Sequence, residues 1–145
     1  MQGFTPTSIL VPVHDGPTAE EAVRLGCRLA RRGRASVHVV SILEVKRSLP
    51  LGSRDEEAVA GVERLLDRAE QIGAQLEVRM DTELLQAREA GPAIVEEITT
   101  KAIDLLVLGL PYRQRYGEFY MGKTAPFLLR HAPCRTLIFR EPPPD

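Results

Sequence analysis

Short apolar runs alternate with longer amphipathic stretches along the chain, and this alternation constrains the fold more than any other feature of the sequence. The runs are rich in β-branched residues, as is typical of strands buried on both faces of a sheet. The stretches between them carry apolar residues at helical spacing. The pattern predicts strands at residues 8–13, 37–43, 76–86, 104–108 and 135–139, and helices that begin near Thr18, Asp55, Pro92 and Ala125.

Residues with special backbone preferences mark the expected element ends. Thr18, with an acid three residues later, has the spacing of a capping box and predicts a helix N-cap. Gly73 is expected at the C′ position of the second helix. Pro92 suits the first turn of the third helix, where a missing N–H costs nothing. Residues 44–54 and 110–123 are expected to be loops.

The order of these elements predicts an α/β fold. Alternating strands and helices imply a parallel sheet covered by helices on both sides. Because crossovers are right-handed, the common solution for five strands is a doubly wound, Rossmann-like, three-layer α/β/α structure. In one such solution, which we adopt, the strand order is 3-2-1-4-5. No internal repeat or linker interrupts the pattern. We therefore expect one domain over residues 1–145, with a short leader at 1–7 and a flexible tail at 141–145.

Composition excludes several functional classes. The chain has 19 basic and 20 acidic residues, so it lacks the basic excess of a general nucleic-acid or membrane-surface binder. No apolar run reaches the length of a membrane span, and the N-terminus has no signal-peptide pattern, so direct membrane insertion is not expected. Cys27 and Cys134 do not make a disulfide framework. We expect a cytoplasmic protein.

Two polar turns are expected to meet at one edge of the sheet. Strands one and four are neighbours where the winding reverses, and ligands of such folds bind beyond the carboxyl ends at that point. His14 and Asp15 follow strand one, and Gly109 ends strand four. Residues 122–124 then open a helix, whose free N–H groups and dipole favour an anion.

The charge near this turn favours the same ligand. Residues 110–135 contain five basic residues and one acid, although the whole chain has a net charge of −1. The sequence therefore predicts a crevice that binds a polyphosphate. The alternative is a surface loop that is basic for solubility alone.

Several segments resemble the universal stress protein family over nearly the whole chain. They are ILVPV followed by a polar turn, the strand before Glu44, the AGPAI helix start, DLLVLG, and LRHAPC before the last strand. The resemblance implies the fold above, an adenine nucleotide such as ATP as ligand, and Mg²⁺ only if ATP is bound. Residues 47–51 and 117–119 look like the members found as cytoplasmic C-terminal domains of amino-acid permeases or as their free-standing relatives, which implies a membrane transporter as a further partner.

Nucleotide-binding members of that family carry Gly-x-x-Gly, nine residues, then Gly-Ser/Thr. The resemblance places Gly109 at the first glycine and Gly122 at the third, and Lys123 stands where Ser or Thr is usual. His14 replaces the acid that usually ends strand one, and Ile42 falls where the family offers backbone groups to adenine. The nucleotide-binding residues implied in this way are Pro12, Val13, His14, Asp15, Ile42, Leu108, Gly109, Tyr112, Arg113, Gly122, Lys123, Thr124 and Ala125.

Tyr112 is the main departure from the family pattern. It stands at the second glycine, so a side chain is expected where the backbone would approach a phosphate. Lys123 would compensate by meeting a phosphate directly. The alternative function is therefore a nucleotide-free dimerisation or regulatory domain, linked to an amino-acid transporter or to a stress response.

Residues 117–124 also match the P-loop pattern G-x-x-x-x-G-K-[ST]. A genuine P-loop follows a strand directly, and here Gly117 lies eight residues beyond Gly109. We interpret the match as coincidence, so a P-loop kinase or ATPase is the weakest hypothesis. No catalytic residue and no metal site is expected, and any enzymatic activity is limited to slow ATP hydrolysis.

The last strand suggests a partner. An apolar strand at a sheet edge needs covering or pairing. The resemblance implies a homodimer through this strand, by antiparallel pairing of Arg135, Thr136, Leu137, Ile138 and Phe139 with a second copy. A charge at Ile138 is then expected to weaken the dimer.

Overall fold

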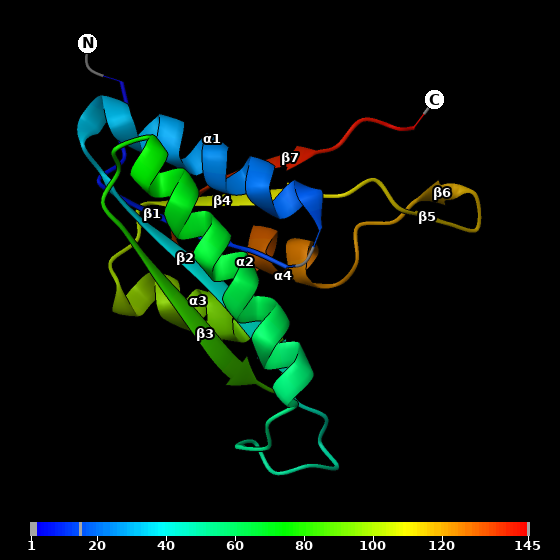
Figure 1. Ribbon diagram of the computed structural model, residues 1–145. Helices are drawn as coiled ribbons and strands as arrows, with labels where there is room; N and C mark the ends of the chain where they lie inside the picture. Colours follow the sequence, from blue (N-terminus) through cyan, green and yellow to red (C-terminus); the bar gives the residue numbers. More distant parts are fainter. Residues whose placement is uncertain (1–2, 15, 145) are drawn as a thin grey trace.

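Five parallel strands form the central sheet in the computed structural model, which describes residues 3–14 and 16–144 (Figure 1). Their order is β3-β2-β1-β4-β7, which confirms the predicted order because β7 is the fifth strand of this sheet. The strands are β1 (Ser8–Pro12), β2 (Ser36–Glu44), β3 (Met80–Ala87), β4 (Leu105–Leu110) and β7 (Arg135–Arg140).

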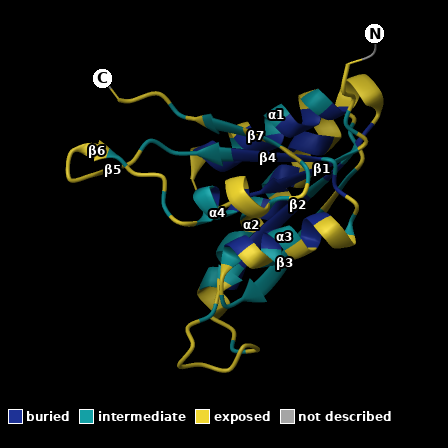
Figure 2. Cartoon of the chain, turned by 180° about the vertical axis from the view of Figure 1, so that it is seen from behind, coloured by how far each residue is buried: buried dark blue, intermediate teal, exposed yellow. Residues whose placement is uncertain are grey.

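Helices cover both faces of the sheet, α1 and α2 on one side and α3 and α4 on the other (Figures 1 and 2). Successive β1 side chains alternate between these layers: Ile9 and Val11 pack with the first pair of helices, and Leu10 with the second. Because both faces are covered, the central strands read as continuous apolar runs. The helices are α1 (Pro17–Gly33), α2 (Glu56–Gln75), α3 (Ala90–Thr100) and α4 (Thr124–His131).

None of the helices within residues 3–14 and 16–144 combines the length and the hydropathy that a membrane crossing requires.

The start of α1 differs from the prediction. The N-cap is Gly16, at φ 105°, and no side chain caps the helix. Pro17 takes the first helical position, where its fixed φ suits the helix and its missing N–H is not needed. Thr18 consequently lies within the first turn and is buried, so the predicted capping box is wrong.

The junction of α2 and β3 also differs. α2 continues past Gly73 to Gln75, and β3 begins at Met80 rather than at residue 76. Gly73 is buried inside the helix, and a Cβ there would lie 2.9 Å from the Met80 Cε. The position therefore needs glycine because it has no side chain, and not because it ends the helix. The left-handed residue after the helix is Glu77, at φ 57°.

The expected loop between β4 and α4 contains a hairpin of β5 (Gln114–Arg115) and β6 (Glu118–Phe119). Its two turn residues, Tyr116 and Gly117, have φ of 54° and 78°, the signs required by a tight type I′ turn. Tyrosine at the first turn position is not the usual Asn or Asp signal, which is why the sequence did not predict a hairpin.

Asp104 ties the start of β1 to the start of β4. Its carboxylate accepts hydrogen bonds from the backbone N–H groups of Thr7, at 3.1 and 3.0 Å, and Ser8, at 3.0 Å. The Thr7 hydroxyl donates a further bond at 2.8 Å. Burial raises the pKa of Asp104, but the hydrogen bonds from Ser8 and Thr7 outweigh it, and the net pKa is lowered.

We expect Asp104→Asn to lower the free energy of unfolding by about 2 kcal/mol at neutral pH, because a charged acceptor of several bonds is lost. Since folding lowers the pKa of Asp104, its contribution is present above the unfolded pKa and is lost as the pH falls through the folded pKa. Urea unfolding at several pH values should show parent and variant converging in acid. Asp67→Asn, at an exposed helical site, is the control. An equal loss at every pH would contradict this account.

Candidate functional site

A cleft of about 520 Å³ opens at the carboxyl ends of β1, β2 and β4. β1 and β4 are neighbours in the sheet, with Ile9 opposite Leu105, and the winding of the sheet reverses between them. Eleven of the thirteen predicted residues line this cleft: Pro12, Val13, His14, Ile42, Leu108, Gly109, Arg113, Gly122, Lys123, Thr124 and Ala125. The structure therefore brings together turns that lie about a hundred residues apart in the sequence.

The two remaining predicted residues are Asp15 and Tyr112. Asp15 lies outside the described residues. Tyr112 does not line the cleft; its ring stacks on Phe119 at 5.4 Å between centroids. The Arg140 guanidinium lies 5.2 Å from the Tyr112 ring and 5.4 Å from the Phe119 ring. The expectation that the Tyr112 side chain occupies the phosphate space is therefore corrected. The ring packs against Phe119 and Arg140 instead.

One half of the cleft is apolar. Ile42 and Leu108 form part of this wall, as expected, and both are buried. Val40, from the same strand as Ile42, and Ile94, from α3, complete it. The sequence reasoning missed the last two. The signal was available, because the end of strand two must lie beside the end of strand one in the predicted order, and α3 covers that face.

The other half is built on the start of α4. Gly122 has φ 78°, and Lys123 follows as the N-cap with no side-chain cap. In the described part of the chain, the backbone N–H groups of Thr124 and Ala125 have no acceptor. The Lys123 ammonium and the Arg113 guanidinium line the same cleft, and neither has a carboxylate within ion-pair distance among the described residues. This end of the cleft is electropositive and suits an anion.

Glu44 caps the N-terminus of α3, the second helix that begins at the cleft. Its carboxylate accepts a hydrogen bond from the Ala90 N–H at 2.8 Å, at the N-terminus of α3. Both residues line the cleft. Because α3 already has a carboxylate at its N-terminus, α4 is left as the helix start that an external anion can reach.

Gly109 is required beneath the cleft for packing. A Cβ at this position would lie 2.6 Å from the Phe139 ring and 3.0 Å from the Thr18 methyl group. The first glycine of the family pattern is thus explained by the close approach of β4, β7 and α1 at the cleft floor.

The P-loop pattern is not realised. Gly117 lies in the hairpin turn, and Glu118 and Phe119 form β6. These three residues do not line the cleft, whereas Gly122, Lys123 and Thr124 do. Within the described residues, no group of three or more His, Cys, Asp or Glu side chains is arranged to hold a metal ion.

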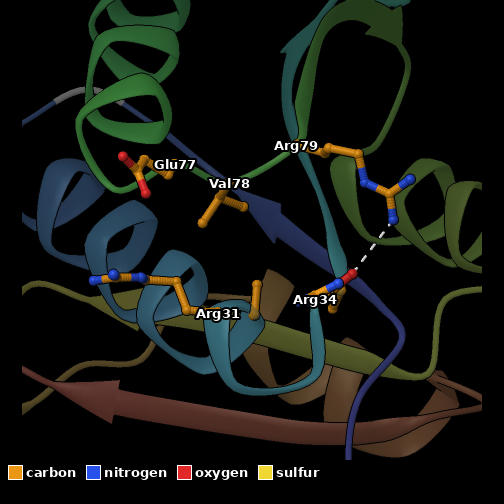
Figure 3. Close-up of a pocket in the computed structure, with 7 residues that line it drawn as sticks. Arg31, Arg34, Glu77, Val78 and Arg79 are labelled. Carbon is orange, nitrogen blue, oxygen red and sulfur yellow. Dashed lines mark hydrogen bonds between the residues drawn. The ribbon is translucent and has the colours of Figure 1, made fainter.

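A second hollow, of about 350 Å³, lies at the opposite end of the sheet, beside the start of β3 (Figure 3). Arg31, Arg34 and Arg79 line it together with the acid Glu77. The Arg79 guanidinium bonds the Arg34 carbonyl at 3.3 Å, and the Arg31 side chain points to the other side (Figure 3). The C-terminal ends of α1 and α2 are also nearby, and their dipoles disfavour an anion. The first cleft is therefore the better candidate for a ligand site.

Comparisons with known proteins agree with the fold. A universal stress protein of Methanocaldococcus jannaschii is 24% identical over 144 residues, covering 92% of this chain and 82% of that protein. The universal stress protein from Archaeoglobus fulgidus in complex with dAMP has a TM-score of 0.73 at 20% identity, covering 93% of this chain and 98% of that one. A family protein from Arabidopsis thaliana with AMP bound has a TM-score of 0.64 at 15% identity, covering 94% and 93%.

The identities of the solved structures are low enough that they establish the fold alone. A model of the universal stress protein family, however, matches residues 6–140, nearly the whole chain. That match includes every strand of the central sheet, the glycine near the end of β4 and the uncapped start of α4. The chain belongs to the universal stress protein family.

Proposed function

We propose that the cleft binds an adenine nucleotide of the ATP or AMP class and that the protein acts as a nucleotide-responsive regulatory module. One observation carries the proposal: a single cleft joins a buried apolar wall to the uncapped start of α4, beside Arg113 and Lys123, which have no carboxylate within ion-pair distance among the described residues. A nucleotide has the matching division into an apolar base and an anionic phosphate.

The proposed orientation follows from this division. The base lies against Val40, Ile42 and Ile94, and the phosphates lie over Gly122 and the first turn of α4. Lys123 supplies charge at the phosphates. Related structures with dAMP and AMP bound support the choice of an adenine nucleotide over other anions. Mg²⁺ would enter only with ATP.

Calorimetric titration with AMP, ADP and ATP, each with and without Mg²⁺, tests the proposal. We expect saturable one-site binding of at least one adenine nucleotide, and weaker binding of ribose 5-phosphate, which lacks the base. Equal affinity for ribose 5-phosphate would show that the apolar wall does not hold a base. No binding of any nucleotide would favour the alternative, a nucleotide-free dimerisation or regulatory domain.

We also propose that the protein forms a homodimer through β7. This strand is an edge of the sheet, paired only with β4 among the described residues. Leu137 on this strand is 41% exposed, although it is apolar. An unpaired apolar edge is suited to pairing with a second copy.

The position of Ile138 in the structure changes the choice of variant for the dimer test. Ile138 packs against the core on the α3 and α4 side, so a charge there would destabilise the monomer as well as the dimer. Leu137→Asp is the cleaner variant, because Leu137 is 41% exposed and belongs to neither core cluster. We expect it to convert the dimer to monomer in light scattering, with an unchanged thermal midpoint of the isolated subunit. A parent protein that is monomeric at all concentrations would contradict the proposal.

The proposed setting is the cytoplasm. Cys27 and Cys134 are both free thiols, and burial raises the pKa of Cys27 to about 11, which makes it an unreactive core residue. A membrane transporter as a further partner stays a prediction, drawn from the resemblance of residues 47–51 and 117–119.

A further inference from the structure

The hairpin segment, residues 112–121, projects from the body of the molecule (Figures 1 and 2). It forms a two-stranded sheet of its own, separate from the central sheet. All three tyrosines of the chain lie within it, together with one of its four phenylalanines. Tyr116 at the tip is 94% exposed, and Tyr120 and Met121 are 41% and 38% exposed. Such a concentration of exposed aromatic side chains requires an explanation beyond folding.

The hairpin segment is held in one shape despite its exposure. An isolated two-stranded hairpin is marginally stable in water. Here the Tyr112 and Phe119 rings stack, and Arg140, at the end of β7, lies over both rings. The Tyr120 N–H also donates to the Arg113 carbonyl at 2.8 Å, which extends the ladder. The tip is therefore presented in a fixed geometry, which lowers the entropy lost when a partner binds.

The charges of the tip indicate what it can bind, because Arg115 lies opposite Glu118 in the hairpin register but is not within ion-pair distance of it. The Arg115 guanidinium lies 5.7 Å from the Tyr116 ring and 5.0 Å from the Tyr120 ring. Neither Arg113 nor Arg115 has a carboxylate within ion-pair distance in the part of the chain that the structure describes. A guanidinium that rests on aromatic rings keeps its N–H edge available for a carboxylate. Tyrosine and arginine are also the residues most enriched at the energetic centres of protein interfaces.

We propose that the hairpin segment is a docking element for an acidic segment of a partner protein, with Arg115 pairing a carboxylate and Tyr116 supplying apolar contact. A single-stranded nucleic acid is less well matched, because base stacking needs open ring faces. The Tyr112 and Phe119 faces are covered by each other and by Arg140, and Arg115 lies 5.0 Å from the Tyr120 ring. Tyr116, 94% exposed, is therefore the one ring of the hairpin segment left open, too few for successive bases to stack. Arg115 and Tyr116 do not line the nucleotide cleft, so docking is independent of the function proposed for the cleft.

The test uses fluorescence anisotropy with a short labelled polyglutamate peptide on the full chain. We expect R115A/Y116A to weaken peptide binding about tenfold or more relative to the parent protein. The matched control is R31A/R32A, which removes two exposed arginines from the last turn of α1 and should leave peptide binding within about twofold. R115A/Y116A should bind AMP as the parent does, which separates this proposal from that for the cleft.

Three results would overturn the proposal. The first is equal peptide affinity for the parent and R115A/Y116A, with both proteins folded by circular dichroism. The second is a larger loss in R31A/R32A, which would mean that only net charge matters. The third is tighter binding of a labelled oligouridylate than of the peptide by the parent protein, together with weaker oligouridylate binding by R115A/Y116A. That result would make the hairpin segment a nucleic-acid surface.

Discussion

Gly122→Val is expected to weaken the binding of AMP or ATP about 100-fold. Gly122 has φ 78°, a region that β-branched residues avoid, so valine must shift the backbone where α4 begins. The shift is expected to turn the N–H groups of Thr124 and Ala125 away from the proposed phosphate position. Losing two hydrogen bonds to a charged phosphate, at about 1.5 kcal/mol or more each, corresponds to about two orders of magnitude in Kd.

The chain offers a matched control for this substitution. Gly117 has the same φ of 78°, and a Cβ at either glycine meets no atom within 4 Å. Gly117 lies in the hairpin turn, outside the cleft, so Gly117→Val introduces equal backbone strain without touching the phosphate position. Calorimetry should show parent-like nucleotide affinity for Gly117→Val. If Gly122→Val also binds like the parent, the phosphate site lies elsewhere.

Tyr112→Gly serves as a second comparison. From the sequence, this change is expected to leave nucleotide affinity unchanged or to improve it. The structure gives the reason for no change: the ring is stacked on Phe119 outside the cleft. A large loss of affinity in Tyr112→Gly would show that the orientation of the hairpin, rather than the ring, controls the cleft.

The fold and the place of the cleft could be predicted because they depend on patterns that span whole elements. Apolar runs such as Leu105–Leu108 specify buried strands, and right-handed crossovers leave only a few strand orders open. In the order that was predicted and is observed, the ends of β1 and β4 meet. Those two ends then carry His14 and Gly109 into one cleft.

What the sequence did not reveal depends on single contacts. Thr18 has the residue type of a cap, but Pro17 one position earlier starts the helix. Gly73 has the residue type of a helix end, but it is needed for the approach of Met80. Tyr112 was expected in the cleft because the family pattern has glycine there. Its partners, Phe119 and Arg140, become visible only when the hairpin and β7 are placed together.

Glu97→Gln is expected to remove most of a fall in stability that occurs between about pH 4.5 and 7. Glu97 on α3 is only 9% exposed. A hydrogen bond with Glu83 on β3, burial and the negative charge of Glu83 raise its pKa to about 7, and Glu96 adds to this while Lys101 opposes it. One Glu83 oxygen is also buried without a hydrogen-bond partner in the described residues. Glu97 therefore takes up a proton more readily in the folded protein than in the unfolded chain.

The sign of the effect follows from the direction of this shift. A carboxyl group whose folded pKa is raised stabilises the fold fully below its unfolded pKa, near 4.5, and loses that contribution as the pH rises through about 7. Glutamine keeps the shape of the protonated acid and can donate to Glu83 at every pH. Glu97→Gln should thus match the parent near pH 4.5 and exceed its free energy of unfolding above pH 7 by at most about 3 kcal/mol.

Urea unfolding across this pH range measures the difference, and the neighbouring acid supplies the control. Glu96 is exposed on the same turn of α3, so Glu96→Gln removes an equal charge without entering the buried pair. Its stability should follow the parent within about 0.5 kcal/mol. A parent protein whose stability is flat from pH 4.5 to 8 would show that water or Lys101 already neutralises the pair. In that case Glu97 on α3 and Glu83 on β3 would pack against each other without a bound proton.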